Sequence, residues 1–269
     1  MYHKIARLID RKFLFWWQPN DNLENVGDYV SRVIVSSVLT LNDKELAEKT
    51  NTRFKLLSTG SILHFANTGD CIWGSGRNGN ISDNLHKFKT LDVRAVRGPL
   101  TRDFLQKKGL TVPEIYGDPA ILLPLFFGKN IIANDKENRK KFVIVPHMSE
   151  PHINTVADHY KKYVDHLVSP RTRPIAFVRK ILNADFVISA SLHGIILAES
   201  YGIPAIYLNR NNAESIFKYN DYYYGTDRSI FHMGKTVEEC LEIGGNPLFD
   251  IHAVQRKLLA AFPVDLWTK

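Results

Sequence analysis

The sequence predicts an α/β protein in which two parallel β-sheets, each with helices outside, face each other across a cleft. Short apolar stretches of strand length alternate with longer amphipathic stretches along most of the 269 residues. This alternation is typical of parallel sheets with crossover helices. A polar segment at residues 129–141 interrupts the alternation and resembles a linker. We therefore expect two Rossmann-like domains, residues 1–135 and 136–269, with strand carboxyl ends at the cleft.

The first half opens with a basic stretch, residues 2–12, whose apolar spacing predicts a short helix. Two interpretations stay open for it: a helix lying in a membrane interface, or a surface helix packed on its own domain. A strand is expected at residues 13–17 and a helix at residues 29–41. Further strands run into glycine turns within residues 54–61, 71–76 and 114–119, and another spans 91–97. A helix starts at Gly98-Pro99 and ends near Gly109, as helix-end preferences suggest.

The second half repeats the alternation without an internal sequence repeat. Strands are expected at residues 142–147, 186–188 and 205–208, and helices at residues 174–182 and 191–201. The tyrosine-rich segment 217–224 is an ordered loop or a short helix. Residues 237–243 and 251–262 are expected to be helices, and the last one can pack back on the first domain.

The composition limits the kinds of molecule that the protein is expected to bind. The net charge of +7 favours an anionic partner, and no basic run is interleaved with aromatic residues as in nucleic-acid modules. The anionic partner expected is therefore a phosphorylated substrate or an acidic membrane surface. The two cysteines, Cys71 and Cys240, are isolated in apolar surroundings, which is typical of reduced thiols in the cytoplasm. No apolar run reaches the 18 residues of a membrane span, and the N-terminal segment does not read as a signal peptide.

The most informative stretch is the strand-to-helix turn at residues 189–194. Its helix start offers unpaired N–H groups and the positive end of a helix dipole, which together bind anions. Ser191 and Gly194 flank His193 there. A histidine at this place can move protons, so His193 is the candidate general acid or base.

Other polar turns are expected at the same cleft, because glycines at strand ends let a ligand approach backbone N–H groups. Asp28 opens a helix, where it is either the N-cap or a base for a hydroxyl. Asp118 precedes Pro119 and can cap its own turn. The residues assigned to substrate binding on this basis are Asn25, Gly60, Ser61, Gly74, Ser75, Gly76 and Asp118.

Cations are needed if the ligand is an anion. Arg97 lies nearest the turn after its strand and is the preferred guanidinium for a carboxylate or phosphate. Lys218 is the second candidate. His147, like His64, lies near a strand end and is assigned to substrate binding. No P-loop, zinc or acidic metal motif occurs, and the Gly74–Gly79 match to a dinucleotide fingerprint lacks an acidic residue at a strand carboxyl end. We therefore expect neither metal nor cofactor.

Taken together, these motifs resemble the polysaccharide pyruvyl transferase family, and within it the xanthan ketal pyruvate transferases. The family likeness rests on Asn-Val-Gly-Asp at 25–28, Trp-Gly-Ser-Gly at 73–76, Val-Arg-Gly-Pro-Leu-Thr at 96–101, Tyr-Gly-Asp-Pro-Ala at 116–120, Ser-Leu-His-Gly at 191–194 and residues 198–204. The narrower likeness adds residues 15–19, 59–61, 145–147, 217–219 and 261–267.

The resemblance implies a two-domain fold like that of GT-B glycosyltransferases, with acceptor on the first domain and donor on the second. It implies phosphoenolpyruvate as donor and a cyclic ketal on two hydroxyls, 4 and 6, of a terminal hexose such as mannose. The acceptor would be a polyprenyl-diphosphate-linked exopolysaccharide repeat unit, used in the cytoplasm or at the inner face of the plasma membrane. His193 matches the family's histidine and is assigned as general acid, while the carboxylate of Asp28, from its place at a helix start, can take the hydroxyl proton. Ser191 stands where family members carry an arginine, so Arg97 or Lys218 must supply that charge.

Two other functions stay open on sequence grounds. A glycosyltransferase that uses sugar nucleotides would share the two-domain fold. A carbohydrate-binding protein without activity would share the sugar-binding surface.

Overall fold

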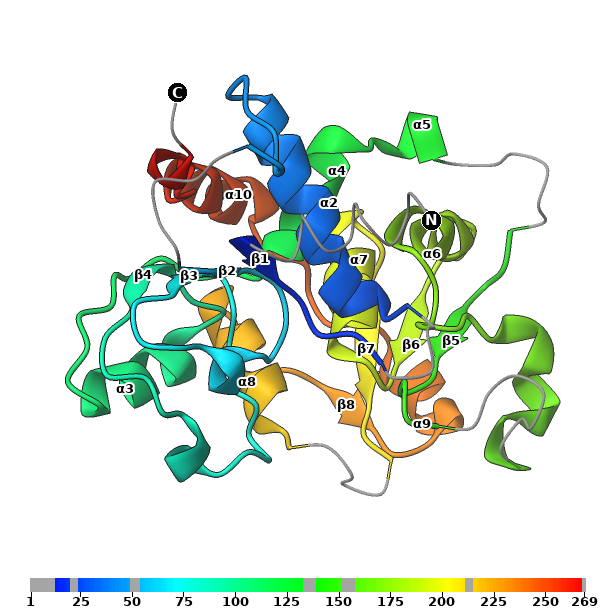
Figure 1. Cartoon of the computed structure of the whole chain (residues 1–269). Helices are drawn as coiled ribbons and strands as arrows, with labels where there is room; N and C mark the ends of the chain where they lie inside the picture. Colours follow the sequence, from blue (N-terminus) through cyan, green and yellow to red (C-terminus); the bar gives the residue numbers. More distant parts are fainter. Residues whose placement is uncertain are drawn as a thin grey trace.

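Figure 1 shows the computed structural model, which describes residues 13–19, 24–48, 54–132, 139–150, 158–210 and 215–267. The helix expected at residues 2–12 lies outside these ranges. Within them, no helix combines the length and the apolar character that crossing a membrane requires.

The first sheet has the order β1-β2-β3-β4 and is parallel throughout. Its strands are Leu14–Phe15, Leu56–Leu57, Cys71–Trp73 and Asp92–Ala95. The helix α2, Val26–Thr40, connects β1 to β2, and α3, Pro99–Lys107, follows β4. Val26, Val30, Ile34 and Val38 of α2 recur every four residues and are all buried, so one face of this helix enters the core.

The second sheet has the order β5-β6-β7-β8 and is also parallel. Its strands are Val143–Val145, Val187–Ser189, Ala205–Leu208 and Met233–Gly234. The helices of this part of the chain are α6 (Pro174–Leu182), α7 (Leu192–Ser200), α8 (Phe217–Gly225), α9 (Val237–Ile243) and α10 (Ile251–Ala260). β5, β6 and β7 are almost fully buried, as continuous apolar runs in parallel sheets usually are.

Two four-stranded parallel sheets with helices confirm the α/β class that the sequence predicts. Four local expectations need correction. Residues 114–119 form no strand, only a single bridge between Val96 and Tyr116. Part of the expected linker is a short helix, α5, at Lys129–Ile132, while residues 133–138 lie outside the description. α2 starts at Val26 rather than near Tyr29, because Asn25 is its N-cap. The two-residue strand β8 was not expected.

The two halves of the chain share one core. α2 packs against α6 and α7, and the turn Pro119–Leu122 (η3) packs against α2, α7 and α10. α8 lies beside α3 of the first half although it follows β7 in sequence (Figure 1). The Trp73 indole donates to the backbone oxygen of Leu258 in α10 at 2.9 Å. Helices and turns from both halves therefore pack directly against each other.

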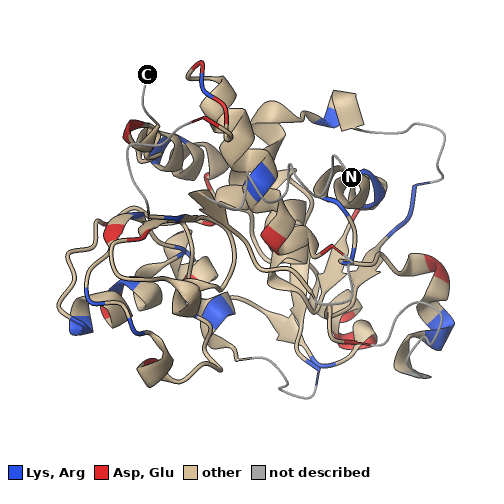
Figure 2. Ribbon diagram, in the orientation of Figure 1, with Lys and Arg blue, Asp and Glu red and all other residues tan. Residues whose placement is uncertain are grey.

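Among the residues that the structure describes, charged side chains do not gather on one element. Figure 2 shows Lys and Arg scattered along the ribbon of both halves and interspersed with Asp and Glu. The cations that matter for a ligand must therefore be identified at the site itself.

Candidate active site

A cavity of about 350 Å³ is lined by residues from both halves of the chain. Loops that follow the carboxyl ends of β1, β2, β3, β5 and β6 contribute to its walls, together with the first turns of α2, α7 and α8. The carboxyl edge of parallel sheets is where α/β proteins bind ligands. The lining residues are Trp17, Asn25, Asp28, Ser61, Ile62, His64, Phe65, Asn78, His147, Met148, Ser149, Ser191, Leu192, His193 and Lys218.

Asp28 lies in the first turn of α2, and its carboxylate faces the cavity. Asn25 caps the helix through its side-chain oxygen, which accepts from the Gly27 N–H at 3.3 Å. The Asn25 amide also donates to Asp28. Asp28 is 7% exposed, and burial raises its pKa to about 7 against the opposing effects of His193 and Asn25. Asp28 can therefore take up or release a proton near neutral pH.

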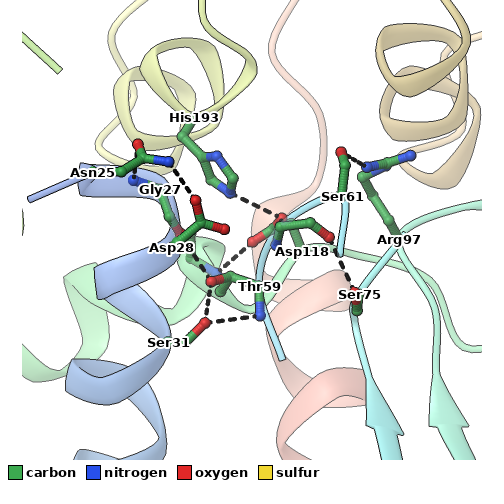
Figure 3. A network of polar contacts seen from close by, with 12 residues as sticks. Asn25, Gly27, Asp28, Ser31, Thr59, Ser61, Ser75, Arg97, Asp118 and His193 are labelled. Atoms are coloured by element: carbon green, nitrogen blue, oxygen red, sulfur yellow. Dashed lines mark hydrogen bonds and ion pairs between the residues drawn. The ribbon is translucent and has the colours of Figure 1, made fainter. Parts of the chain in front are cut away.

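His193 is the second residue of α7 and its ring points to a fully buried carboxylate. Its Nε2 lies 3.3 Å from Asp118 Oδ2 (Figure 3). Asp118 is held in turn, because its Oδ1 accepts from the Ala120 N–H at 3.0 Å and its Oδ2 from the Gly60 N–H at 3.4 Å. A carboxylate fixed in this way restricts the orientation of the neighbouring imidazole.

Hydroxyl groups tie β2 to the start of α2 beneath these side chains. The Thr59 hydroxyl donates to the Gly27 carbonyl at 2.9 Å, and the Thr59 N–H donates to Ser31 Oγ at 3.2 Å (Figure 3). Ser31 and Thr59 also share a hydrogen bond between their hydroxyls. This buried network holds the start of α2 against the loop after β2, and so fixes the position of Asp28 relative to Gly60 and Asp118.

Lys218 enters the cavity from the first turn of α8. The pKa of Lys218 is lowered to about 7. Burial is the largest cause, the Arg97 charge acts in the same direction, and Asp28 opposes both. An anionic ligand beside Lys218 would favour the ammonium form. His147, after β5, contacts Ser149 Oγ through Nδ1 at 2.6 Å, and burial followed by Lys218 lowers its pKa to about 4. His147 is thus neutral at pH 7.

Arg97 is fully buried and lies behind the cavity wall rather than in it. Its Nε donates to Asp221 Oδ2 at 3.0 Å, its Nη2 to the Arg77 carbonyl at 2.8 Å, and its Nη1 to Ser61 Oγ at 2.6 Å. Ser61 does line the cavity, so the guanidinium reaches a ligand only through this hydroxyl. Asp221, which sequence reasoning missed, also accepts from the Thr101 N–H and hydroxyl at 2.9 and 2.6 Å.

The remaining predicted residues shape the walls without lining the cavity. Gly60 and Gly74 adopt φ angles of +102° and +88°, which favour glycine. Gly76 leaves room for the Arg97 guanidinium, and Gly194 for the Ser189 side chain. The Ser75 hydroxyl donates to the Gly60 carbonyl at 3.1 Å. Of the predicted residues, the cavity is lined by Asn25, Asp28, Ser61, His147, Ser191, His193 and Lys218.

Sequence reasoning assigned no ligand role to several lining residues. They are Trp17, Ile62, His64, Phe65, Asn78, Met148, Ser149 and Leu192. Most of them follow a strand by a few residues, and that position is the signal that could have found them. Among the described residues, no three His, Cys, Asp or Glu side chains converge as metal ligands would.

The sequence pattern of the polysaccharide pyruvyl transferase family matches residues 14–212, well over half of the chain. The chain is 28% identical over 179 residues to the succinoglycan biosynthesis protein ExoV of Rhizobium meliloti (strain 1021), covering 62% of this chain and 52% of that protein. It is 29% identical over 187 residues to an uncharacterized protein of Acanthamoeba polyphaga mimivirus, covering 64% and 61%.

These matches span only about half to three fifths of the length of those relatives. No solved structure matches the chain significantly. The family pattern covers the strand-end turns that carry Asp28, Asp118 and His193. The chain belongs to the polysaccharide pyruvyl transferase family.

Proposed function

We propose that this protein transfers a pyruvyl group from phosphoenolpyruvate to two hydroxyls of a terminal sugar, forming a cyclic ketal. The observation that carries the proposal is the convergence of Asp28, His193 and Lys218 on one cavity. This set offers a carboxyl that titrates near neutrality, a carboxylate-bound imidazole and a cation. Membership of the pyruvyl transferase family supports the same chemistry.

The donor is an anion with a phosphate and a carboxylate. The N–H groups at the start of α7 and the Lys218 ammonium suit these groups, since helix N-termini and lysines bind phosphate. Ser191 is the partly buried N-cap of α7 and occupies the position of the family's arginine. A serine carries no positive charge, so the charge must come from another residue. Lys218 supplies that charge, because Arg97 is committed to Asp221, Ser61 and the Arg77 carbonyl.

The proton steps follow from the two acid–base groups. His193 donates a proton to the methylene carbon of phosphoenolpyruvate, which makes the adjacent carbon electrophilic, and Asp118 holds the ring in position. A sugar hydroxyl attacks this carbon while Asp28 accepts the hydroxyl proton. The carbon–oxygen bond to phosphate then breaks, and a second hydroxyl closes the ketal as its proton leaves with phosphate. None of these steps requires a metal ion.

We infer that the acceptor is a neutral terminal hexose, with mannose and its hydroxyls 4 and 6 as the first choice, on a polyprenyl-diphosphate-linked repeat unit. The relative named for succinoglycan biosynthesis supports an exopolysaccharide setting. Work in the cytoplasm, at the inner face of the plasma membrane, would bring the protein to such an acceptor. A GT-B-like cleft, with acceptor on the first sheet and donor on the second, would hold the two substrates.

The decisive experiment incubates the protein with phosphoenolpyruvate and a synthetic mannoside. We expect release of inorganic phosphate and a product heavier than the mannoside by the mass of phosphoenolpyruvate less phosphoric acid. The His193→Ala variant should lose about 10²–10⁴-fold in rate, the usual contribution of a general acid.

Two results would contradict the proposal. Thermal protection by a UDP- or GDP-sugar but not by phosphoenolpyruvate would indicate a glycosyltransferase. Sugar binding that persists in His193→Ala, without phosphate release from any acceptor by the wild type, would indicate a carbohydrate-binding protein.

A further inference from the structure

The cavity has two chemically different walls. Asp28, His193, Lys218 and His147 lie on the wall made by α2, α7, α8 and the loop after β5. A second wall comes from the loops after β1, β2 and β3. Its described lining residues, which carry no charge at neutral pH, are Trp17, Ser61, Ile62, His64, Phe65 and Asn78. His64 is counted among the uncharged residues because burial, and to a smaller extent the nearby His86, lowers the pKa of its imidazole and so favours the neutral form.

Two aromatic rings dominate this uncharged wall. Phe65 ends the turn Leu63–Phe65 and is 41% exposed, with its ring centroid 5.2 Å from that of Phe15. Trp17 is partly buried against the apolar cluster beneath the same turn. Phe15 supports Phe65 from the side, so the ring is held at the cavity although much of it meets solvent. A held, exposed ring costs little further entropy when a ligand packs on it.

Polar groups accompany the rings. Ser61 Oγ accepts a hydrogen bond from the buried Arg97, so the Ser61 hydroxyl hydrogen remains to donate to a ligand oxygen. Asn78 uses its side-chain oxygen on the Asn80 N–H at 3.0 Å. A few placed hydrogen-bond groups beside aromatic rings suit a ligand that is apolar on one face and polar at its rim.

We propose that Phe65 and Trp17 form the platform on which the ring of an uncharged hexopyranose stacks, with Ser61 and Asn78 contacting its hydroxyls. The axial C–H groups of a pyranose carry partial positive charge and complement the negative face of an aromatic ring. None of the described side chains on this wall is Asp, Glu, Lys or Arg, which suits an uncharged ring better than a phosphate or carboxylate. The anionic donor then lies at His193 and Lys218.

The proposal deepens the proposed function, since it assigns the acceptor to one wall of the same cavity. It is tested by equilibrium binding, which needs no turnover. Methyl α-D-mannopyranoside is titrated into the full chain by saturation-transfer NMR. The Phe65→Ala variant should bind it about five- to tenfold more weakly, the usual worth of one aromatic contact. Phe65→Tyr should restore binding, and phosphoenolpyruvate affinity should stay unchanged in both variants.

Phe54→Ala is the matched control, because Phe54 is 37% exposed and does not line the cavity. Mannitol is the control ligand, since it offers hydroxyls without a rigid ring face and should bind more weakly than the mannoside. The platform is refuted if the wild type does not bind the mannoside, if Phe54→Ala weakens binding as much as Phe65→Ala, or if Phe65→Ala weakens phosphoenolpyruvate instead. Mannoside binding that depends on Phe65, without any pyruvyl transfer, would refute the proposed function alone.

Discussion

At the scale of single residues, Asp28 combines low exposure with a position at the cavity wall. Burial raises its pKa from 3.8 to about 7. Between these pH values the folded protein holds a proton that the unfolded chain has released, so stability falls as pH rises from about 4 to about 7. Above pH 7 the folded protein holds Asp28 as a buried carboxylate, which lowers its free energy of unfolding. Such costs are common where a side chain is kept for chemistry rather than for stability.

Asp28→Asn should therefore trade activity for stability. The amide cannot accept the hydroxyl proton, so the transfer rate should fall about 10²–10⁴-fold. The variant should be more stable than the wild type at pH 8, on the order of 2–4 kcal/mol by the free energy of a pKa shift of this size. At pH 5 the difference should be much smaller, because the wild-type carboxyl is then protonated. Thermal melts of the variant and the wild type at pH 5 and pH 8 measure this difference in stability.

Asp43→Asn provides the control, since Asp43 is exposed just beyond the far end of α2. Its melting temperature should follow the wild type at both pH values. A stability difference between Asp28→Asn and the wild type that does not change with pH would contradict the burial of a titrating carboxyl.

At the scale of elements, the first turns of α2 and α7 contact each other through a glycine. A Cβ at Gly27 would lie 2.1 Å from His193 Nδ1, so any larger residue must displace the imidazole. The Gly27→Ala variant should lose about a hundredfold in transfer rate, because a displacement of about 1 Å in a catalytic group has costs of this size. The melting temperature should also fall, because forcing a larger side chain into a packed site costs about 1–3 kcal/mol, so the rates are compared at a temperature where both proteins are folded.

Gly128→Ala is the matched control, because nothing lies within 4 Å of a Cβ at Gly128. It should keep the wild-type rate. If Gly27→Ala kept that rate as well, the His193 position in the structure would not be the one that acts in catalysis.

The elements also show what the sequence could predict. The turn at 189–194 was found because an apolar strand, a serine, a histidine and a glycine lie next to each other in sequence, and the local physics of a helix start suffices there. Residues 114–119 were expected as a strand, but only Tyr116 pairs with its neighbour. The role of Arg97 could not be predicted, because its partner Asp221 lies 124 residues away and only the fold brings them together.

At the scale of the whole molecule, Asp221 joins the two halves of the chain. It lies on α8, within the second half, yet its carboxylate accepts from Arg97 and Thr101 of the first half. Arg97 and Asp221 are both fully buried. Because Lys218 lies one turn earlier on α8, the same contact places a cation from one half over the cavity that both halves form. A cleft enzyme needs such a link if its donor and acceptor sites are to keep their distance.

Asp221→Asn should weaken this link, because the amide keeps one acceptor oxygen but replaces the other, and the charge that pairs with Arg97, by an NH2 donor. Leaving a buried charge unpaired costs about 3–5 kcal/mol, so denaturant unfolding should show a loss of that size. The KM for phosphoenolpyruvate should rise as Lys218 shifts. Asp265→Asn is the control, since Asp265 pairs with Arg94 across the same two halves at 2.8 Å but is 58% exposed. A surface pair of this kind contributes at most about 1 kcal/mol. Equal losses in the two variants would mean that burial does not distinguish the two links and that α8 is held by its apolar packing instead.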